Sequence, residues 1–178
     1  MPGWVALLQG VNVGRRKRIA MADLRRMVTE AGGADPVTVA NSGNVVFSHP
    51  ATAEPGLRAD LETRISAAVG QPVPVLLRSA PELAAVVADN PFPDAAADPT
   101  TLHVEFLLQE VPGVLEGLDQ GGDQLHDHGR ELYLFAPHKL SGATYDSRTL
   151  HRRLGSHHTS RNWNTVGKLL ALVSSLPD

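Results

Sequence analysis

A dense group of polar and basic side chains lies near the end of the chain, at residues 159–165, with the sequence Thr-Ser-Arg-Asn-Trp-Asn-Thr. An apolar segment with helical spacing, residues 166–176, follows it directly. The first turn of a helix has free backbone N–H groups and a partial positive charge, so polar side chains there could hold an anion. They could instead only cap the helix. The candidate ligand-binding residues of this segment are Arg161, Asn162 and Thr165.

A second candidate site is the loop at residues 10–14, which follows a mostly apolar segment, residues 4–11, that predicts a buried strand. A loop between a strand and a helix often binds phosphate through backbone N–H groups. The loop matches neither the Walker motif nor the dinucleotide fingerprint. Asn12 and Gly14 are therefore candidates for ligand binding, and the alternative is a tight turn that uses Gly for positive φ and Asn12 as a cap.

The run Arg-Arg-Lys-Arg at residues 15–18 is the densest cluster of charge in the chain. Such cations could neutralise the phosphates of a nucleotide or nucleic acid, although a solvated loop is the usual explanation of such a run. Aromatic residues make up only 4% of the chain, which argues against a protein that binds single strands by stacking on their bases. From this run Arg15 and Arg16 join the predicted ligand-binding residues.

A polar turn, Asn-Ser-Gly-Asn at residues 41–44, separates two short segments with strand character and predicts a hairpin. Its Ser42 and Asn44 complete the set of predicted ligand-binding residues. Other chemistry is less well supported. His126 and His128 have a spacing that metal sites use, but a third ligand would have to come from His103 or the pair at residues 157–158. We predict neither a metal nor a cofactor.

The order of the elements predicts the fold. Helical spacing at residues 24–31, the hairpin, a helix over residues 55–70 and a strand over residues 73–77 give β-α-β-β-α-β, the order of ferredoxin-like folds. Ser79 and Glu82 have the spacing of a capping box, and Asp146 can cap the start of a later helix. The second half is predicted to contain a strand, a possible short helix, a hairpin and two further helices, at residues 102–108, 114–118, 124–135, 147–154 and 162–175.

We therefore predict an α+β fold of two ferredoxin-like βαββ(αβ) halves with antiparallel sheets, helices on one face of each sheet and a C-terminal helix. The halves would be residues 1–79 and 80–178, packed as one compact unit. No apolar run approaches the roughly 20 residues of a membrane helix, and the chain has no cysteine. We expect a cytoplasmic protein without a membrane partner.

Charge is distributed unevenly along the chain. Residues 1–49 hold six Lys or Arg against three Asp or Glu, and residues 132–178 hold six against two. Residues 80–131 hold one Arg against eleven acidic residues. If the two ends meet in the fold, they form a basic surface opposite an acidic one.

Four motifs in order, LLQGVNVG, NSGNVVF, NPF and TSRNWNTVGKL, resemble the bacterial family called domain of unknown function 1697, over essentially the whole chain. The resemblance implies an α+β protein of two ferredoxin-like halves and no agreed activity. It also implies a set of polar motif positions: Asn12, Gly14, Ser42, Gly43, Asn44, Arg161, Asn162 and Thr165.

The chain departs from the family pattern where the first predicted strand ends. The pattern usually has Arg-Gly there, and this chain has Gln9 and Gly10. Arg15 replaces a second Gly of the pattern and could supply the missing charge.

Three functions remain open. In the leading hypothesis the two basic ends form a groove that binds an anion, either a phosphorylated small molecule or a nucleic acid. The second is a small-molecule enzyme that uses the same groove with a histidine as acid or base. The third is an interaction protein that self-associates through a sheet face or edge strand. The oligomeric state is open.

Overall fold

The computed structural model describes residues 1–155 and 157–177. The chain divides into two compact units, Met1–Ala85 with Lys168–Asp178, and Val86–Gly167. The boundaries fall inside two helices, α3 (Ala80–Ala88) and α5 (Trp163–Ser174).

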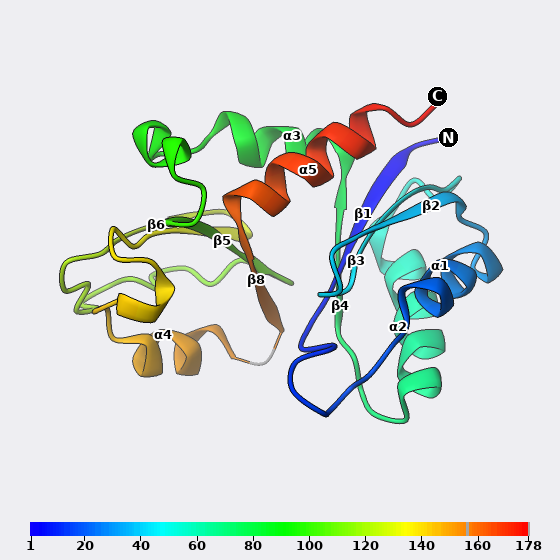
Figure 1. The fold of residues 1–178 in the computed structure, drawn as a ribbon, viewed down its shortest axis with the longest axis horizontal. Helices are drawn as coiled ribbons and strands as arrows, with labels where there is room; N and C mark the ends of the chain where they lie inside the picture. Colours follow the sequence, from blue (N-terminus) through cyan, green and yellow to red (C-terminus); the bar gives the residue numbers. More distant parts are fainter. Residues whose placement is uncertain (156, 178) are drawn as a thin grey trace. The chain divides into compact units, whose positions relative to one another are not determined.

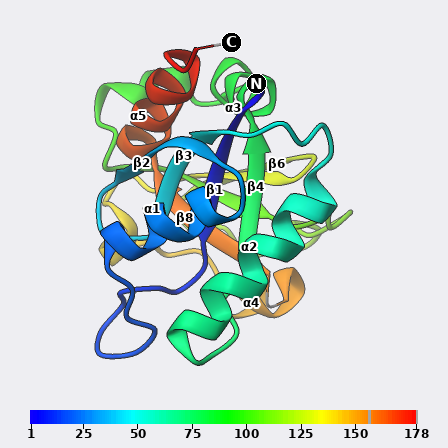
Figure 2. The same ribbon diagram turned by 90° about the vertical axis from the view of Figure 1, so that its right-hand side faces the viewer.

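The first unit contains one antiparallel sheet with strand order β2-β3-β1-β4 and two helices. Figure 1 shows α1 and α2 on the same side of this sheet, and Figure 2 shows them from that side, in front of the strands. This arrangement is the predicted ferredoxin-like one. The elements are β1 (Gly3–Leu8), α1 (Met21–Glu30), β2 (Ala34–Val39), β3 (Asn44–Ser48), α2 (Glu54–Val69) and β4 (Val75–Ser79).

The core of the first unit lies between this sheet and its two helices. Successive residues of a strand point to opposite faces, so Ala6 and Leu8 of β1 point toward the helices together with Phe47 of β3. Leu24 of α1 and Leu61 of α2 pack against them and are fully buried. The apolar stripes of the two helices therefore hold them on one face of the sheet.

The second unit repeats this plan, with a second antiparallel sheet of order β6-β7-β5-β8. Leu150 and Leu154 of α4 share a buried cluster with residues of β5, β6 and β7. The predicted α+β fold with two antiparallel sheets is confirmed. The elements are η1 (Pro93–Ala97), β5 (Leu102–Leu107), β6 (Gln124–His128), β7 (Glu131–Phe135), η2 (Leu140–Gly142), α4 (Ser147–Leu154) and β8 (His158–Asn162), where η denotes a 3-10 helix.

One predicted helix is not formed, and one strand was not predicted. The possible short helix at residues 114–118 is replaced by turns, although Val114 and Leu118 are buried in the core. Residues 158–162 form β8, the strand that completes the second sheet, and the last helix begins at Trp163, one residue after its predicted start. Since β8 consists of His, Thr, Ser, Arg and Asn, it lacks the apolar alternation that marks a strand.

Two predicted helix caps are confirmed. The backbone N–H and the hydroxyl of Ser79 donate to Glu82 Oε2, at 2.7 and 2.8 Å, and start α3 as a capping box. Asp146 Oδ1 accepts from the N–H of Thr149 at 3.0 Å and starts α4. In the described part of the chain, no helix combines the length and apolar character needed to cross a membrane.

Gly43, in the turn between β2 and β3, should be far less tolerant of substitution than Gly70 at the end of α2. Both have φ +77°, but a Cβ at Gly43 would lie 2.5 Å from Val11 Cγ2 and 2.7 Å from Leu8 Cβ, whereas Gly70 faces open space. Gly70→Ala should lower the free energy of unfolding by about 1–2 kcal/mol, the cost of a left-handed non-Gly residue. Gly43→Ala should cost about 1–3 kcal/mol more because of overpacking. Urea denaturation followed by circular dichroism measures both, and equal losses would contradict this account of the turn.

Candidate functional site

The predicted site residues are divided between the two units. Those of the first unit lie in the loop after β1 and in the β2–β3 turn, and they are Asn12, Gly14, Arg15, Arg16, Ser42 and Asn44. The second unit contains Arg161, Asn162 and Thr165, at the end of β8 and the start of α5. A groove that joins the two sets stays a prediction.

The side chain of Asn12 organises the loop between β1 and α1. Its Nδ2 donates to the carbonyl oxygens of Ile19, at 2.9 Å, and Asn41, at 2.8 Å. Its Oδ1 accepts from the N–H of Ile19 at 3.0 Å, and its own N–H donates to the carbonyl of Lys17 at 3.1 Å. Asn12 has φ 56°, a left-handed conformation that Asn tolerates better than most residues. We call these contacts the Asn12 clasp, which closes the loop and ties it to the β2–β3 turn.

Hydrogen bonds also hold the β2–β3 turn against the end of β1. Asn44 is fully buried, and its Nδ2 donates to the carbonyl of Val39 and to Ser42 Oγ, both at 2.9 Å. The N–H of Leu8 donates to the carbonyl of Gly43 at 2.8 Å. Two separated motifs of the sequence, LLQGVNVG and NSGNVVF, therefore meet within the first unit.

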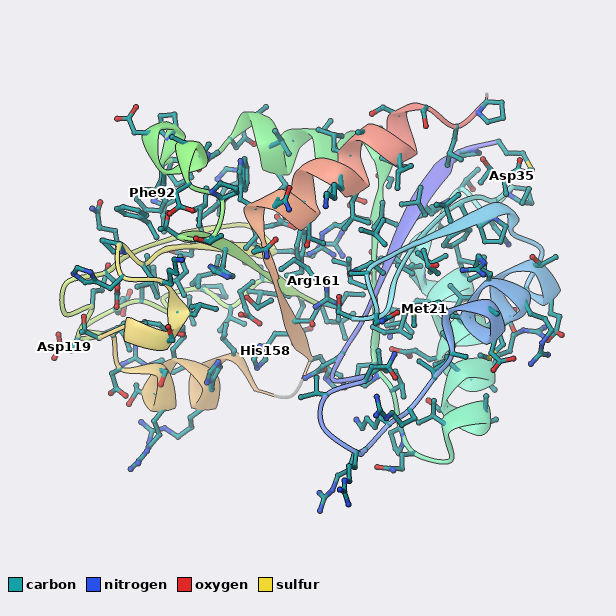
Figure 3. The ribbon with its side chains drawn as sticks, in the orientation of Figure 1. Met21, Asp35, Phe92, Asp119, His158 and Arg161 are labelled. Atoms are coloured by element: carbon teal, nitrogen blue, oxygen red, sulfur yellow. The ribbon has the colours of Figure 1, made fainter. Side chains whose placement is uncertain are left out.

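A hollow of about 530 Å³ opens beside the clasp, at the start of α1. Met21, labelled in Figure 3, is the first residue of this helix. The residue before it, Ala20, makes no side-chain cap hydrogen bond, so its side chain does not satisfy the first N–H groups of the helix. The hollow is lined by Asn12, Arg18, Ile19, Ala20, Met21 and Asn41.

The arginines of the basic run are open to solvent. Arg15, Arg16 and Arg18 are all exposed, as is Gly14 before them, and Lys17 is half-buried. Figure 2 shows the segment between β1 and α1 as a blue loop that projects from the first unit. Cations on a projecting loop raise the local electrostatic potential and attract anions from solution.

Arg161 does not lie at a helix entrance, as the sequence had suggested, but in β8, where it is only 8% exposed (Figure 3). Its Nη1 donates to Thr159 Oγ1 and to the carbonyl of Ser160, both at 2.7 Å. Burial lowers the pKa of Arg161 to about 10, and the negative charge of Glu105 opposes this shift. Arg161 therefore remains a cation at neutral pH.

Asn162 and Thr165 form the cap of α5. Asn162 Oδ1 accepts from the N–H of Thr165 at 2.9 Å, the bond expected between an N-cap residue and the third residue of a helix. The sequence left two roles open for these residues, anion binding and helix capping. In the structure they cap the helix.

The histidines of β6 belong to no cluster of potential metal ligands in the described part of the chain. His126 and His128 are exposed, and His128 Nε2 lies 3.6 Å from Asp89 Oδ2. Over residues 1–155 and 157–177, no group of three or more His, Cys, Asp or Glu side chains could hold a metal ion.

Comparison with known proteins supports the family suggested by the motifs. The model of a family described as a protein of unknown function (DUF1697) matches residues 1–133. The chain belongs to this family. The NSGN turn and the loop after β1, both within the matched residues, are the two segments that the Asn12 clasp joins.

A solved structure of a conserved bacterial protein from Streptococcus pneumoniae is similar to this DUF1697 protein, with a TM-score of 0.75 and 20% identity. The match covers 97% of this chain and 98% of that one. At this identity the likeness establishes the shared fold alone. None of the curated proteins matches the chain.

Arg18, which lines the hollow, belongs to the basic run at residues 15–18 that the sequence singled out as a source of charge. Sequence reasoning missed Asn41, which also lines the hollow. Asn41 had no signal in the sequence, since its contact with Asn12 uses a backbone carbonyl.

Substitution Asn12→Asp should open the loop of this DUF1697 protein. The carboxylate can still accept from Ile19, but it loses both donated bonds and faces two carbonyl oxygens. At about 1 kcal/mol for each hydrogen bond, opening should rise by about 10–100-fold. Limited trypsin digestion at residues 15–18 measures it. The control Asn41→Ala keeps the carbonyl that Asn12 binds and should digest like the wild type, and equal cleavage of both variants would contradict the clasp.

Proposed function

We propose that this protein binds a small anion that carries phosphate, in the hollow at the start of α1. The observation that supports the proposal most is the uncapped helix start, which opens on a hollow of about 530 Å³ that Arg18 also lines. Free backbone N–H groups, a helix dipole and a guanidinium group are the recurrent elements of phosphate binding in proteins.

The loop is ordered before a ligand arrives. The Asn12 clasp holds its two ends with four hydrogen bonds, so binding does not have to supply the entropy of ordering it. In this proposal Asn12 and Asn44 position the loop and the turn, whereas Arg18 and the backbone of α1 contact the ligand. Arg15 and Arg16, both exposed, attract the anion through their charge.

A small molecule fits better than a nucleic acid. The hollow has the size of a small-molecule site, which is typically about 300–1,000 Å³. Stacking of bases would need aromatic side chains, and none lines the hollow among the described residues. In the cytoplasm, where we propose that the protein acts, phosphorylated metabolites are the abundant anions of this size.

Arg161, Asn162 and Thr165 are not needed for this site. Arg161 is buried in the second unit, and the other two residues cap α5. Their contribution to a ligand stays a prediction that the same experiment can examine.

Isothermal titration calorimetry with inorganic pyrophosphate tests the proposal. Arg18→Gln should weaken binding by about 10-fold or more, because a hydrogen bond to a charged group contributes about 1.5–3 kcal/mol. Raising the salt from 0.05 to about 0.5 M should weaken wild-type binding as well, since exposed charges are screened. The matched control Arg64→Gln removes the same charge from α2 and should bind like the wild type.

Pyrophosphate that binds Arg18→Gln as tightly as the wild type would exclude the hollow as the site. Loss of binding on Arg161→Ala but not on Arg18→Gln would transfer the site to the second unit. A single-stranded oligonucleotide that binds more tightly with increasing length, and more tightly than pyrophosphate, would replace the small-molecule proposal by a nucleic-acid one.

A further inference from the structure

A second hollow, of about 300 Å³, lies within the second unit, on the face of its sheet that α4 covers. Its polar lining begins with Glu105 of β5 and Ser160 of β8, which face each other across neighbouring strands. Tyr145, Ser147 and His151 come from the segment that leads into α4 and from α4 itself. The apolar lining consists of Leu134, Leu140 and Ala143.

Three hydroxyl groups around this hollow have unused hydrogen-bonding capacity. Within the described part of the chain, the side-chain hydroxyls of Tyr145, Ser147 and Ser160 make no hydrogen bond to the protein. Tyr145 and Ser160 are partly buried, so their hydroxyls are not simply surface groups. Polar groups that converge on a hollow without partners are those that can fix the orientation of a ligand.

The carboxylate of Glu105 is held in place by a histidine. Glu105 Oε1 lies 2.5 Å from His158 Nδ1, and the two side chains are 13% and 15% exposed. The ring of His151 stacks on that of His158, with centroids 5.4 Å apart and planes 15° apart. A carboxylate has about four acceptor positions, so Glu105 keeps accepting capacity beside this bond.

The lining of the hollow includes one carboxylate, that of Glu105, and none of its described residues is Lys or Arg. The pKa of Tyr145 is raised by burial first and then by the charges of Glu105 and Asp123. Asp123 is 6% exposed and accepts from the N–H of Tyr145 at 2.9 Å. A second carboxylate is therefore bonded to the backbone of this tyrosine. Both acids belong to the acidic middle of the sequence, residues 80–131.

We propose that this hollow binds a small organic ammonium ion, a primary amine with a short apolar or aromatic tail. The ammonium group would donate to Glu105 and to the hydroxyls of Tyr145 and Ser160. These three groups provide one acceptor for each of its three N–H bonds. The tail would cover Leu134, Ala143 and Leu140, the last of which is 40% exposed. This proposal is independent of the anion site in the first unit.

A metal ion and an anion fit less well. Within residues 1–155 and 157–177, no three ligating side chains come together for a metal. An anion would face the Glu105 carboxylate without a Lys or Arg among the described lining residues to offset it. An ammonium ion gains from the same charge.

The probes are 2-phenylethylammonium, its neutral counterpart 2-phenylethanol and the anion 3-phenylpropionate, each titrated into the full-length protein and followed by amide NMR shifts. The amine should bind in the millimolar range, as expected for a ligand of this size, and should shift the amides of residues 143–147 and 160. The alcohol should bind about 10-fold more weakly, and the carboxylate more weakly still.

Glu105→Gln keeps the shape of the side chain and an acceptor for His158 but removes the charge. It should weaken binding of the amine by about 10–100-fold, the worth of a hydrogen bond to a charged group, and leave the alcohol nearly unchanged. The control Glu110→Gln removes an exposed carboxylate of the same unit and should have no effect. Tyr145→Phe provides a second variant that should weaken the amine about 3–10-fold, whether or not Glu105→Gln folds.

Amide shifts that cluster outside the hollow, or an alcohol or carboxylate that binds as tightly as the amine, would overturn the proposal. Full affinity for the amine in folded Glu105→Gln, or in Tyr145→Phe, would overturn it as well. Neither result depends on pyrophosphate binding, so this site and the anion site succeed or fail separately.

Discussion

The donation of the two Asn12 amide hydrogens to the carbonyls of Ile19 and Asn41 is the interaction on which the arrangement of the first unit's polar loops depends. A twelve-residue connection without regular structure would otherwise sample many conformations, and its cations would repel one another. The amide binds both the far end of its own loop, at Ile19, and the β2–β3 turn, at Asn41. One side chain therefore fixes the positions of both segments. The glycine at position 43 completes this arrangement, because any side chain there would collide with Val11 and Leu8.

Much of the fold could be predicted because apolar patterns determine it. β1 and β3 are buried over nearly their whole length, and β1 is a continuous apolar run in the sequence. The buried positions of α2 repeat with the period of a helix. The caps at Ser79 and Asp146 use residue types that are favoured at helix starts. β8 could not be predicted in this way. Its buried residues are Thr159 and Arg161, which are polar, and their partners in the sheet are known only once β5 is in place.

The candidate site was harder to predict for a different reason. Asn, Ser and Thr at a loop or helix start can bind a ligand or their own backbone with the same donors and acceptors. At Asn12, Asn44 and Asn162 the structure shows bonds to the protein's own backbone, and composition alone has no means to distinguish the two. The exposed cations and the uncapped start of α1 are what remain available to a ligand.

The strand order of the second sheet places β8 at its edge, and β8 carries the cation of Arg161 among its inward-facing residues. An edge strand exposes backbone donors and acceptors with which a strand of another chain can pair. One way in which natural proteins discourage such pairing is a charged side chain that points inward. A copy of β8 added by another molecule would have to bury a further guanidinium group in the new sheet. The polar composition that makes this strand hard to recognise in the sequence is thus also of the kind that discourages pairing with another strand at that edge.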